Sequence, residues 1–201
     1  MKHLRDHHWK ALPAAAGEGM TNMPSFDQGY SEFLTEMNGG AFFEGALILY
    51  GNSEQAGFDL QTVNALMQEL YGKLVERKFF FGQDILGLQY YLDVKKKVVG
   101  QMNIETGEME VIARHFPAFL AELENDLDYL TGLDLLRDYV EENGPLEFGA
   151  RLCPMKPFVI GGEYEVSNLK AKNALENLKI NAFVYHKIKD LPDGANVSFK
   201  P

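Results

Sequence analysis

The chain has 201 residues, of which 46% are apolar and 14 are Phe, which is enough for a sizeable core in one large domain or in one domain with an appendage. Its single cysteine, Cys153, excludes an intrachain disulfide. The sequence holds no apolar run of about 18 residues, and charged and histidine residues fill the N-terminus where a signal peptide needs an apolar core. We therefore expect a soluble, cytoplasmic protein without a membrane partner.

The net charge of −10 comes almost entirely from one segment. Residues 105–142 carry 11 acidic and 2 basic side chains, whereas residues 1–104 carry 12 and 9 and residues 143–201 carry 6 and 8. A block of negative charge repels nucleic acid, whose affinity for proteins depends largely on phosphate contacts. The same block attracts a basic protein. We therefore expect no nucleic-acid partner.

The chain opens with residues 1–24, which show no clear period and are expected to be a loosely ordered lead-in, with a short helix near Leu4–Leu12 as its one candidate element. Apolar residues at helical spacing predict a helix over 26–37, with Ser25 as its N-cap. Asn38, Gly39 and Gly40 follow, and they are typical of a helix end because Asn and Gly accept the left-handed conformation. An apolar run at 46–50 predicts a buried strand, and helical spacing predicts a second helix over 60–74.

Four short runs rich in aromatic and β-branched residues come next, separated by turn residues. They predict an antiparallel meander with strands over 78–81, 88–94, 97–104 and 108–113. From Phe116 the apolar period changes to 3.6, and Pro117 suits a first helical turn. This acidic helix is expected to break at Thr131-Gly132 and to continue to Glu142.

Residues 145–201 differ in composition from the rest of the chain, with several prolines and a second glycine pair. We expect a C-terminal extension that packs on the same domain. Within it, a strand is predicted over 163–166, followed by a helical turn that Ser167 or Asn168 caps and that runs to Leu178.

The order of these elements resembles the SMI1/KNR4 family of the SUKH superfamily. The matching stretches cover roughly residues 26–130, and residues 161–169 look like the extension of bacterial members; the stretches are YSEFLTEMNGG at 30–40, FGQDILG at 81–87, YLD at 91–93 and ARHFPAFL at 113–120. The resemblance implies an α+β domain over 25–144, an antiparallel sheet flanked by N-terminal and C-terminal helices. It also implies that six matching positions determine the fold: Asn38, Gly39, Gly40, Phe81, Gly82 and Asp84.

Bacterial members of this family resemble immunity proteins, which bind and block toxins. The resemblance therefore implies a non-catalytic protein that neutralises a cognate toxin, such as a nuclease or deaminase; the alternative is an adaptor or regulatory domain without a toxin partner. A basic toxin would dock on the acidic segment, for which the candidate residues are Glu105, Glu108, Glu110, Glu122, Glu124, Asp126 and Asp128. The competing interpretation of these residues is an ordinary solvated helix face.

No catalytic or cofactor motif stands out in the chain. A catalytic cysteine needs a partnering base, and nothing in the sequence links His115 or His186 to Cys153. Asp84 is better explained as a turn former that bonds its own backbone than as one of a pair of catalytic carboxylates. We therefore predict no enzymatic activity, no metal and no cofactor.

Overall fold

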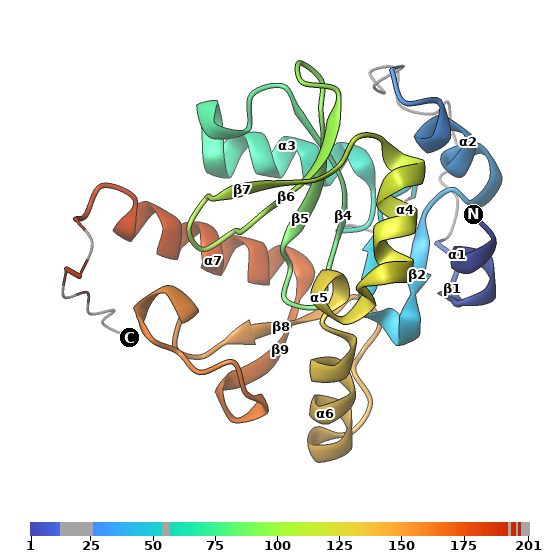
Figure 1. Ribbon diagram of the computed structural model, residues 1–201. Helices are drawn as coiled ribbons and strands as arrows, with labels where there is room; N and C mark the ends of the chain where they lie inside the picture. Colours follow the sequence, from blue (N-terminus) through green and yellow to red (C-terminus); the bar gives the residue numbers. More distant parts are fainter. Residues whose placement is uncertain (13–25, 54–56, 193, 196, 198–201) are drawn as a thin grey trace.

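The computed structural model describes residues 1–12, 26–53, 57–192, 194–195 and 197, and Figure 1 shows its arrangement. Seven strands form one sheet in sequence order, and every neighbouring pair is antiparallel. The strands are β1 (His8–Lys10), β2 (Gly40–Phe42), β3 (Leu47–Leu49), β4 (Lys78–Gln83), β5 (Gln89–Asp93), β6 (Val98–Met102) and β7 (Met109–Ala113). The predicted α+β meander flanked by helices is therefore confirmed.

Helices surround this sheet, and a two-stranded sheet lies beside it (Figure 1). The helices are α1 (Lys2–Asp6), α2 (Gln28–Met37), α3 (Leu60–Tyr71), α4 (Phe116–Asn125), α5 (Leu127–Thr131), α6 (Leu133–Asn143) and α7 (Ala174–Ile188). The 3-10 turns are η1 (Phe43–Gly45), η2 (Gly72–Val75), η3 (Phe158–Ile160) and η4 (Val166–Asn168), and the small sheet pairs β8 (Ala150–Pro154) with β9 (Leu169–Asn173).

Aromatic rings fill the space between the sheet and helices α2 and α4. Successive residues of a strand face opposite sides, so Phe81 of β4 points to this layer. Its ring centroid lies 5.5 Å from that of Tyr30 on α2 and 5.6 Å from that of Phe116 on α4. All three side chains are completely buried. Because buried aromatic side chains contribute large apolar areas, this cluster fixes both helices on the sheet.

Helix α3 satisfies backbone hydrogen bonds of β4 at a point that lies beyond the end of the neighbouring strand β3. The Asn64 side chain donates to the Phe80 carbonyl and accepts from the Phe80 amide, both at 2.8 Å. One side chain thus supplies two ladder bonds that a neighbouring strand would otherwise make. Further along α3, Tyr71 stacks obliquely on Tyr185 of α7, with ring centroids 5.2 Å apart, so the last helix packs on the main domain.

The helix end at Asn38 has the conformation that the sequence predicts. Asn38 is left-handed at φ 49° and ψ 39°, and its side chain both donates to and accepts from the backbone of Asn52. Gly39 has φ +81°, and a Cβ there would lie 2.6 Å from the Leu49 carbonyl oxygen. A Cβ on Gly82 would similarly lie 2.7 Å from the Ile48 carbonyl oxygen. Only glycine allows these close backbone approaches.

The N-terminal prediction is wrong in part where the structure describes it: a short helix is present, earlier than expected, but the segment is ordered. Residues 2–6 form α1 and residues 8–10 form β1, which pairs with β2, instead of a loosely ordered lead-in. Isolated apolar and aromatic contacts hold this segment: Leu4 is buried, and His7 stacks on Phe43. Because these residues do not recur at a regular spacing, the sequence gives no sign of β1. The predicted cap Ser25 lies outside the described residues, and Asp27 is the N-cap of α2, accepting from the Tyr30 amide.

The C-terminal predictions are also wrong in detail. Residues 166–168 form a 3-10 turn, and the strand comes later, at β9. Asn168 caps no helix, since its side chain bonds the backbone of Lys156 and Glu163 and holds the loop together. Asn173 caps α7 instead, by accepting from the Leu175 amide.

The acidic helical region breaks twice. The break at Gly132 is confirmed, because Gly132 is left-handed and separates α5 from α6. A second break at Asp126, with φ −144° and ψ 67°, separates α4 from α5. This break turns α5 towards the sheet and shapes the surface described next.

Candidate functional site

Six of the seven predicted partner-binding residues lie on the surface. Glu122 and Glu124 belong to α4, Asp126 follows it and Asp128 begins α5. Glu110 lies in β7, and Glu108 immediately precedes that strand. All six are exposed. We call them the acidic surface: Glu108, Glu110, Glu122, Glu124, Asp126 and Asp128.

Glu105 does not belong to this surface, which corrects its prediction. Its side chain is buried, with only 4% of the residue exposed, and burial raises the pKa of its carboxyl group. The carboxylate accepts the backbone N–H groups of Phe158 at 3.2 Å and Val159 at 3.0 Å. Glu105 therefore ties η3 to the β6–β7 hairpin. Its two donors come more than 50 residues later in the chain, so local sequence gives no sign of this role.

Helix α5 is fixed on one face of β5, β6 and β7. The Tyr90 hydroxyl donates to the Leu130 carbonyl, and Gln101 donates to the Tyr90 hydroxyl at 3.1 Å. At the border of the sheet, the Tyr129 hydroxyl donates to Glu110 at 3.2 Å. These bonds join one side chain from each of the three strands to α5. The position of Tyr129 beside Glu110 is therefore built into the fold.

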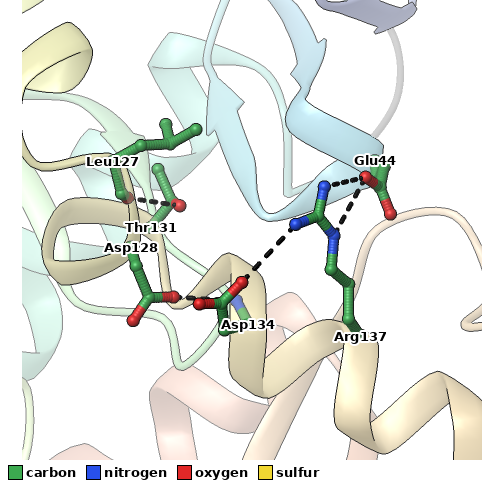
Figure 2. A network of polar contacts seen from close by, with 6 residues as sticks. All are labelled: Glu44, Leu127, Asp128, Thr131, Asp134 and Arg137. Atoms are coloured by element: carbon green, nitrogen blue, oxygen red, sulfur yellow. Dashed lines mark hydrogen bonds and ion pairs between the residues drawn. The ribbon is translucent and has the colours of Figure 1, made fainter.

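Other polar contacts position the junction between α5 and α6, as Figure 2 shows. Asp128 accepts the backbone N–H of Asp134 at 2.7 Å and so serves the start of α6. Arg137 reaches from α6 to Glu44, at 2.6 Å, and to Asp134, at 3.5 Å. Arg137 is one of only two basic residues in the segment 105–142, and it is already paired with carboxylates. Arg137 therefore makes no ion pair with the acidic surface.

A groove of about 530 Å³ opens between the β6–β7 hairpin and α5. Its lining combines two carboxylates, two amides and an aromatic ring, from Leu88, Gln101, Asn103, Glu108, Met109, Glu110 and Tyr129. Tyr129 is 60% exposed. Tyr129 was not among the predicted site residues, although an aromatic residue beside Asp128 and off the apolar helix stripe was a usable signal.

A second groove, of about 600 Å³, lies between α6 and the loop that leads into η4. It too combines carboxylates with an exposed tyrosine, and its lining is Leu135, Asp138, Glu141, Glu142, Tyr164, Glu165, Val166 and Ser167. Partial burial raises the pKa of the Tyr164 hydroxyl to about 12, with smaller contributions from the charges of Asp84 and Asp128. The first groove is lined by Tyr129 of α5, and the second is lined by four residues of α6, the helix that follows.

The groups considered for catalysis have structural partners. Cys153 is buried in β8, and burial raises the pKa of its thiol to about 11, which disfavours the nucleophilic thiolate. The His115 ring accepts the Ala118 amide and thereby caps α4. His186 contacts the Leu70 carbonyl at 2.6 Å. Within the described residues, no three His, Cys, Asp or Glu side chains gather in a way that suits a metal ion.

A buried polar group at the centre of the molecule was not predicted. Arg151 of β8 is 1% exposed and donates to the carbonyls of Gly45 and Ala150. Asp84 is also buried and accepts the amides of Leu86 and Leu88 at 3.0 and 2.8 Å, as a turn former does. Burial raises the pKa of Asp84 to about 7, opposed by the amide bonds and by the charge of Arg151. The Arg151 bond to Gly45 thus links the C-terminal segment to η1, and Asp84 holds its own turn.

Comparison with known proteins places the fold and leaves the activity open. No protein-family model matches the chain, and no curated protein does. Among solved structures, the chain is similar to the crystal structure of Atu4351 from Agrobacterium tumefaciens, with a TM-score of 0.62 and 16% sequence identity. The similarity covers 89% of this chain and 86% of that one. Such a likeness shows a shared fold.

The described part of the chain contains no helix that could span a membrane. None of the helices there has both the length and the apolar character that crossing a bilayer requires.

Proposed function

We propose that this protein is a non-catalytic binding protein of the cytoplasm that neutralises a basic bacterial toxin, as immunity proteins of the SMI1/KNR4 type do. The proposal rests on the resemblance of the sequence to that family and on one observation of the structure. That observation is the acidic surface, six exposed carboxylates on β7, α4 and α5. The groove lined by Glu108, Glu110 and Tyr129 gives this surface a hollow that a partner side chain can fill.

The charge of the surface favours a partner that itself acts on nucleic acid. A nuclease or deaminase needs basic side chains to hold phosphate. A strongly acidic inhibitor is steered to such a site, and opposite charges raise the association rate most at low ionic strength. Occupying the basic site is enough to block the toxin, so the inhibitor itself needs no catalytic residue.

The test begins with a toxin gene immediately upstream whose product ends in a nuclease-like or deaminase-like domain. Coexpression should protect cells from this toxin, and the purified proteins should bind with an affinity that falls as salt rises. The double variant Glu122→Lys with Glu124→Lys should weaken binding by at least tenfold at low salt. Asp128 is left intact because it also bonds the start of α6.

The matched control is Glu69→Lys with Glu76→Lys, which changes the net charge equally through exposed residues on and after α3. If the control weakens binding as much as the α4 variant, only net charge matters and the acidic surface is not the interface. If cells gain no protection and the protein instead captures an enzyme or scaffold of a cellular pathway, the toxin proposal fails in favour of an adaptor.

A further inference from the structure

The border strand β7 combines an open hydrogen-bonding edge with the acidic groove. It pairs with β6 on one side, and no strand pairs with its other side in the parts of the chain that the structure describes. Figure 1 shows β7 at this border of the sheet. Val111, in the middle of the strand, is 55% exposed. An exposed edge presents unpaired N–H and C=O groups, which an extended peptide can join as an added strand.

From this geometry we infer that the basic partner docks by adding a strand to β7, with basic side chains at alternating positions. The inference rests on the proposed function and deepens it by naming the docking edge and the sequence pattern of the partner. Glu108 and Glu110 are two residues apart, so they share one side of the strand. A strand laid beside them places its own residues i and i+2 on that same side.

Tyr129 makes the groove suited to a guanidinium or ammonium group. Its ring lines the groove together with Glu108 and Glu110, and its hydroxyl orients the Glu110 carboxylate. The Glu108 carboxylate accepts from the Thr106 hydroxyl at 3.1 Å, so it too has a defined position. A cation between a carboxylate and an aromatic face gains from both. On the opposite side, Val111 offers an apolar contact for the intervening residue of the added strand.

The same charges disfavour a second copy of this chain as the occupant. Two β7 edges brought together would place Glu108 and Glu110 of both copies close to one another. Like charges on adjacent strands are destabilising, and charged side chains are a known protection against edge-to-edge pairing. A basic strand gains from the charge that repels a second copy. The expected pattern of the partner is therefore basic, apolar, basic.

Two peptides of equal composition test this pattern with the full-length protein. The first is acetyl-Ser-Arg-Val-Arg-Val-Ser-amide, with arginines at alternating positions, and the second is acetyl-Ser-Val-Arg-Arg-Val-Ser-amide, with adjacent arginines. Titrations followed by amide NMR shifts should give an affinity for the first at least threefold higher than for the second. The largest shifts should fall on Glu108–Val111 and Tyr129. Hydrogen exchange of β7 amides should slow when the first peptide binds.

Variants locate the contact. Glu110→Gln and Tyr129→Ala should each weaken the first peptide by roughly threefold, as expected for one partly exposed ion pair or cation–π contact. The control Glu124→Gln removes the same charge from α4 and should leave the affinity within twofold. Methylating the backbone nitrogens of the first peptide should abolish its preference, because the added strand then loses its donors.

Equal affinity for both peptides, no binding of either, shifts spread over α4 and α6, or shifts confined to the α6 groove would each overturn the inference. So would self-association through β7. The proposed function fails separately: if the toxin is neither bound nor neutralised while the alternating peptide still docks on β7, only that function is lost. If the toxin is neutralised equally well by the Glu110→Gln and Tyr129→Ala variants, only the docking edge is wrong.

Discussion

The buried and the exposed carboxylates of this protein use the same chemical group in opposite ways. Asp27, Asp84 and Glu105 are buried, and each accepts two backbone N–H groups. In the described structure, by contrast, the exposed side chains of Glu122 and Glu124 have no hydrogen-bond or ion-pair partner. A carboxylate that accepts backbone N–H groups therefore stabilises the fold, whereas one without such donors is free to contact a partner. The local density of acidic residues does not distinguish the two.

The largest expected effect tests the buried group at Asp84. Burial raises the pKa of Asp84 from 3.8 to about 7, so folding favours the protonated form. Its contribution to stability is therefore complete below about pH 4 and is lost as the pH rises through about 7. Between pH 5 and pH 8 the wild type should lose about 2–3 kcal/mol more unfolding free energy than Asp84→Asn, whose amide oxygen can accept the same two bonds. Urea unfolding at both pH values measures this, and parallel changes in the two proteins would contradict it.

Asp27 should show the next largest effect, because it joins two elements far apart in sequence. It caps α2 and also accepts the Phe116 amide at 2.6 Å, at the start of α4. Asp27→Ala removes the cap and leaves a buried N–H unpaired, which together cost about 2 kcal/mol of unfolding free energy. Denaturant unfolding measures the loss. If the exposed control Glu124→Ala cost as much, the distinction between the two kinds of carboxylate would fail.

Glu105 lies within the acidic segment 105–142 and yet is buried, so it allows a buried and an exposed carboxylate of the same segment to be compared. Glu105→Ala should cost about 2 kcal/mol, because two amides lose their acceptor. Hydrogen exchange should become faster at Phe158 and Val159, the two amides concerned. The neighbouring Glu108→Ala should change neither quantity appreciably. Unchanged exchange in the Glu105 variant would show that η3 is held by other contacts.

The smallest expected effect concerns the exposed carboxylates themselves. Glu122→Gln with Glu124→Gln should change the unfolding free energy by less than about 0.5 kcal/mol, since surface substitutions away from specific contacts rarely do more. Thermal and urea unfolding measure this directly. A loss above about 1 kcal/mol would mean that these side chains belong to the fold and not to a docking surface.

The sequence predicted the fold well where its period was clear. The aromatic and β-branched runs over 78–104, the alternation over 108–113 and the 3.6-residue spacing from Phe116 predicted the meander and the helix that follows it. Strands β4 to β6 are almost completely buried, and the apolar face of α4 meets the core. The strand β9 was missed because its sequence, LKAKN, contains two lysines and has little apolar content. The small sheet forms through pairing with β8, which no local pattern encodes.

The candidate site was predicted in part for a similar reason. Exposed carboxylates on a helix face can be read from spacing, so Glu122 and Glu124 were placed correctly on the surface. The burial of Glu105 depends on amides contributed by η3, and the groove depends on the break at Asp126, which brings Tyr129 to Glu110. Such meetings between distant segments come from tertiary packing, which a single sequence does not reveal.

The most direct test is the salt dependence of binding between this protein and the toxin that we propose as its partner. Affinity should fall steeply between about 50 and 300 mM salt for the wild type, because screening weakens attraction between exposed charges. The slope should flatten in Glu122→Lys with Glu124→Lys and stay steep in Glu69→Lys with Glu76→Lys. Wild-type binding that is indifferent to salt, or equal slopes in both variants, would contradict the claim that the acidic surface receives the partner.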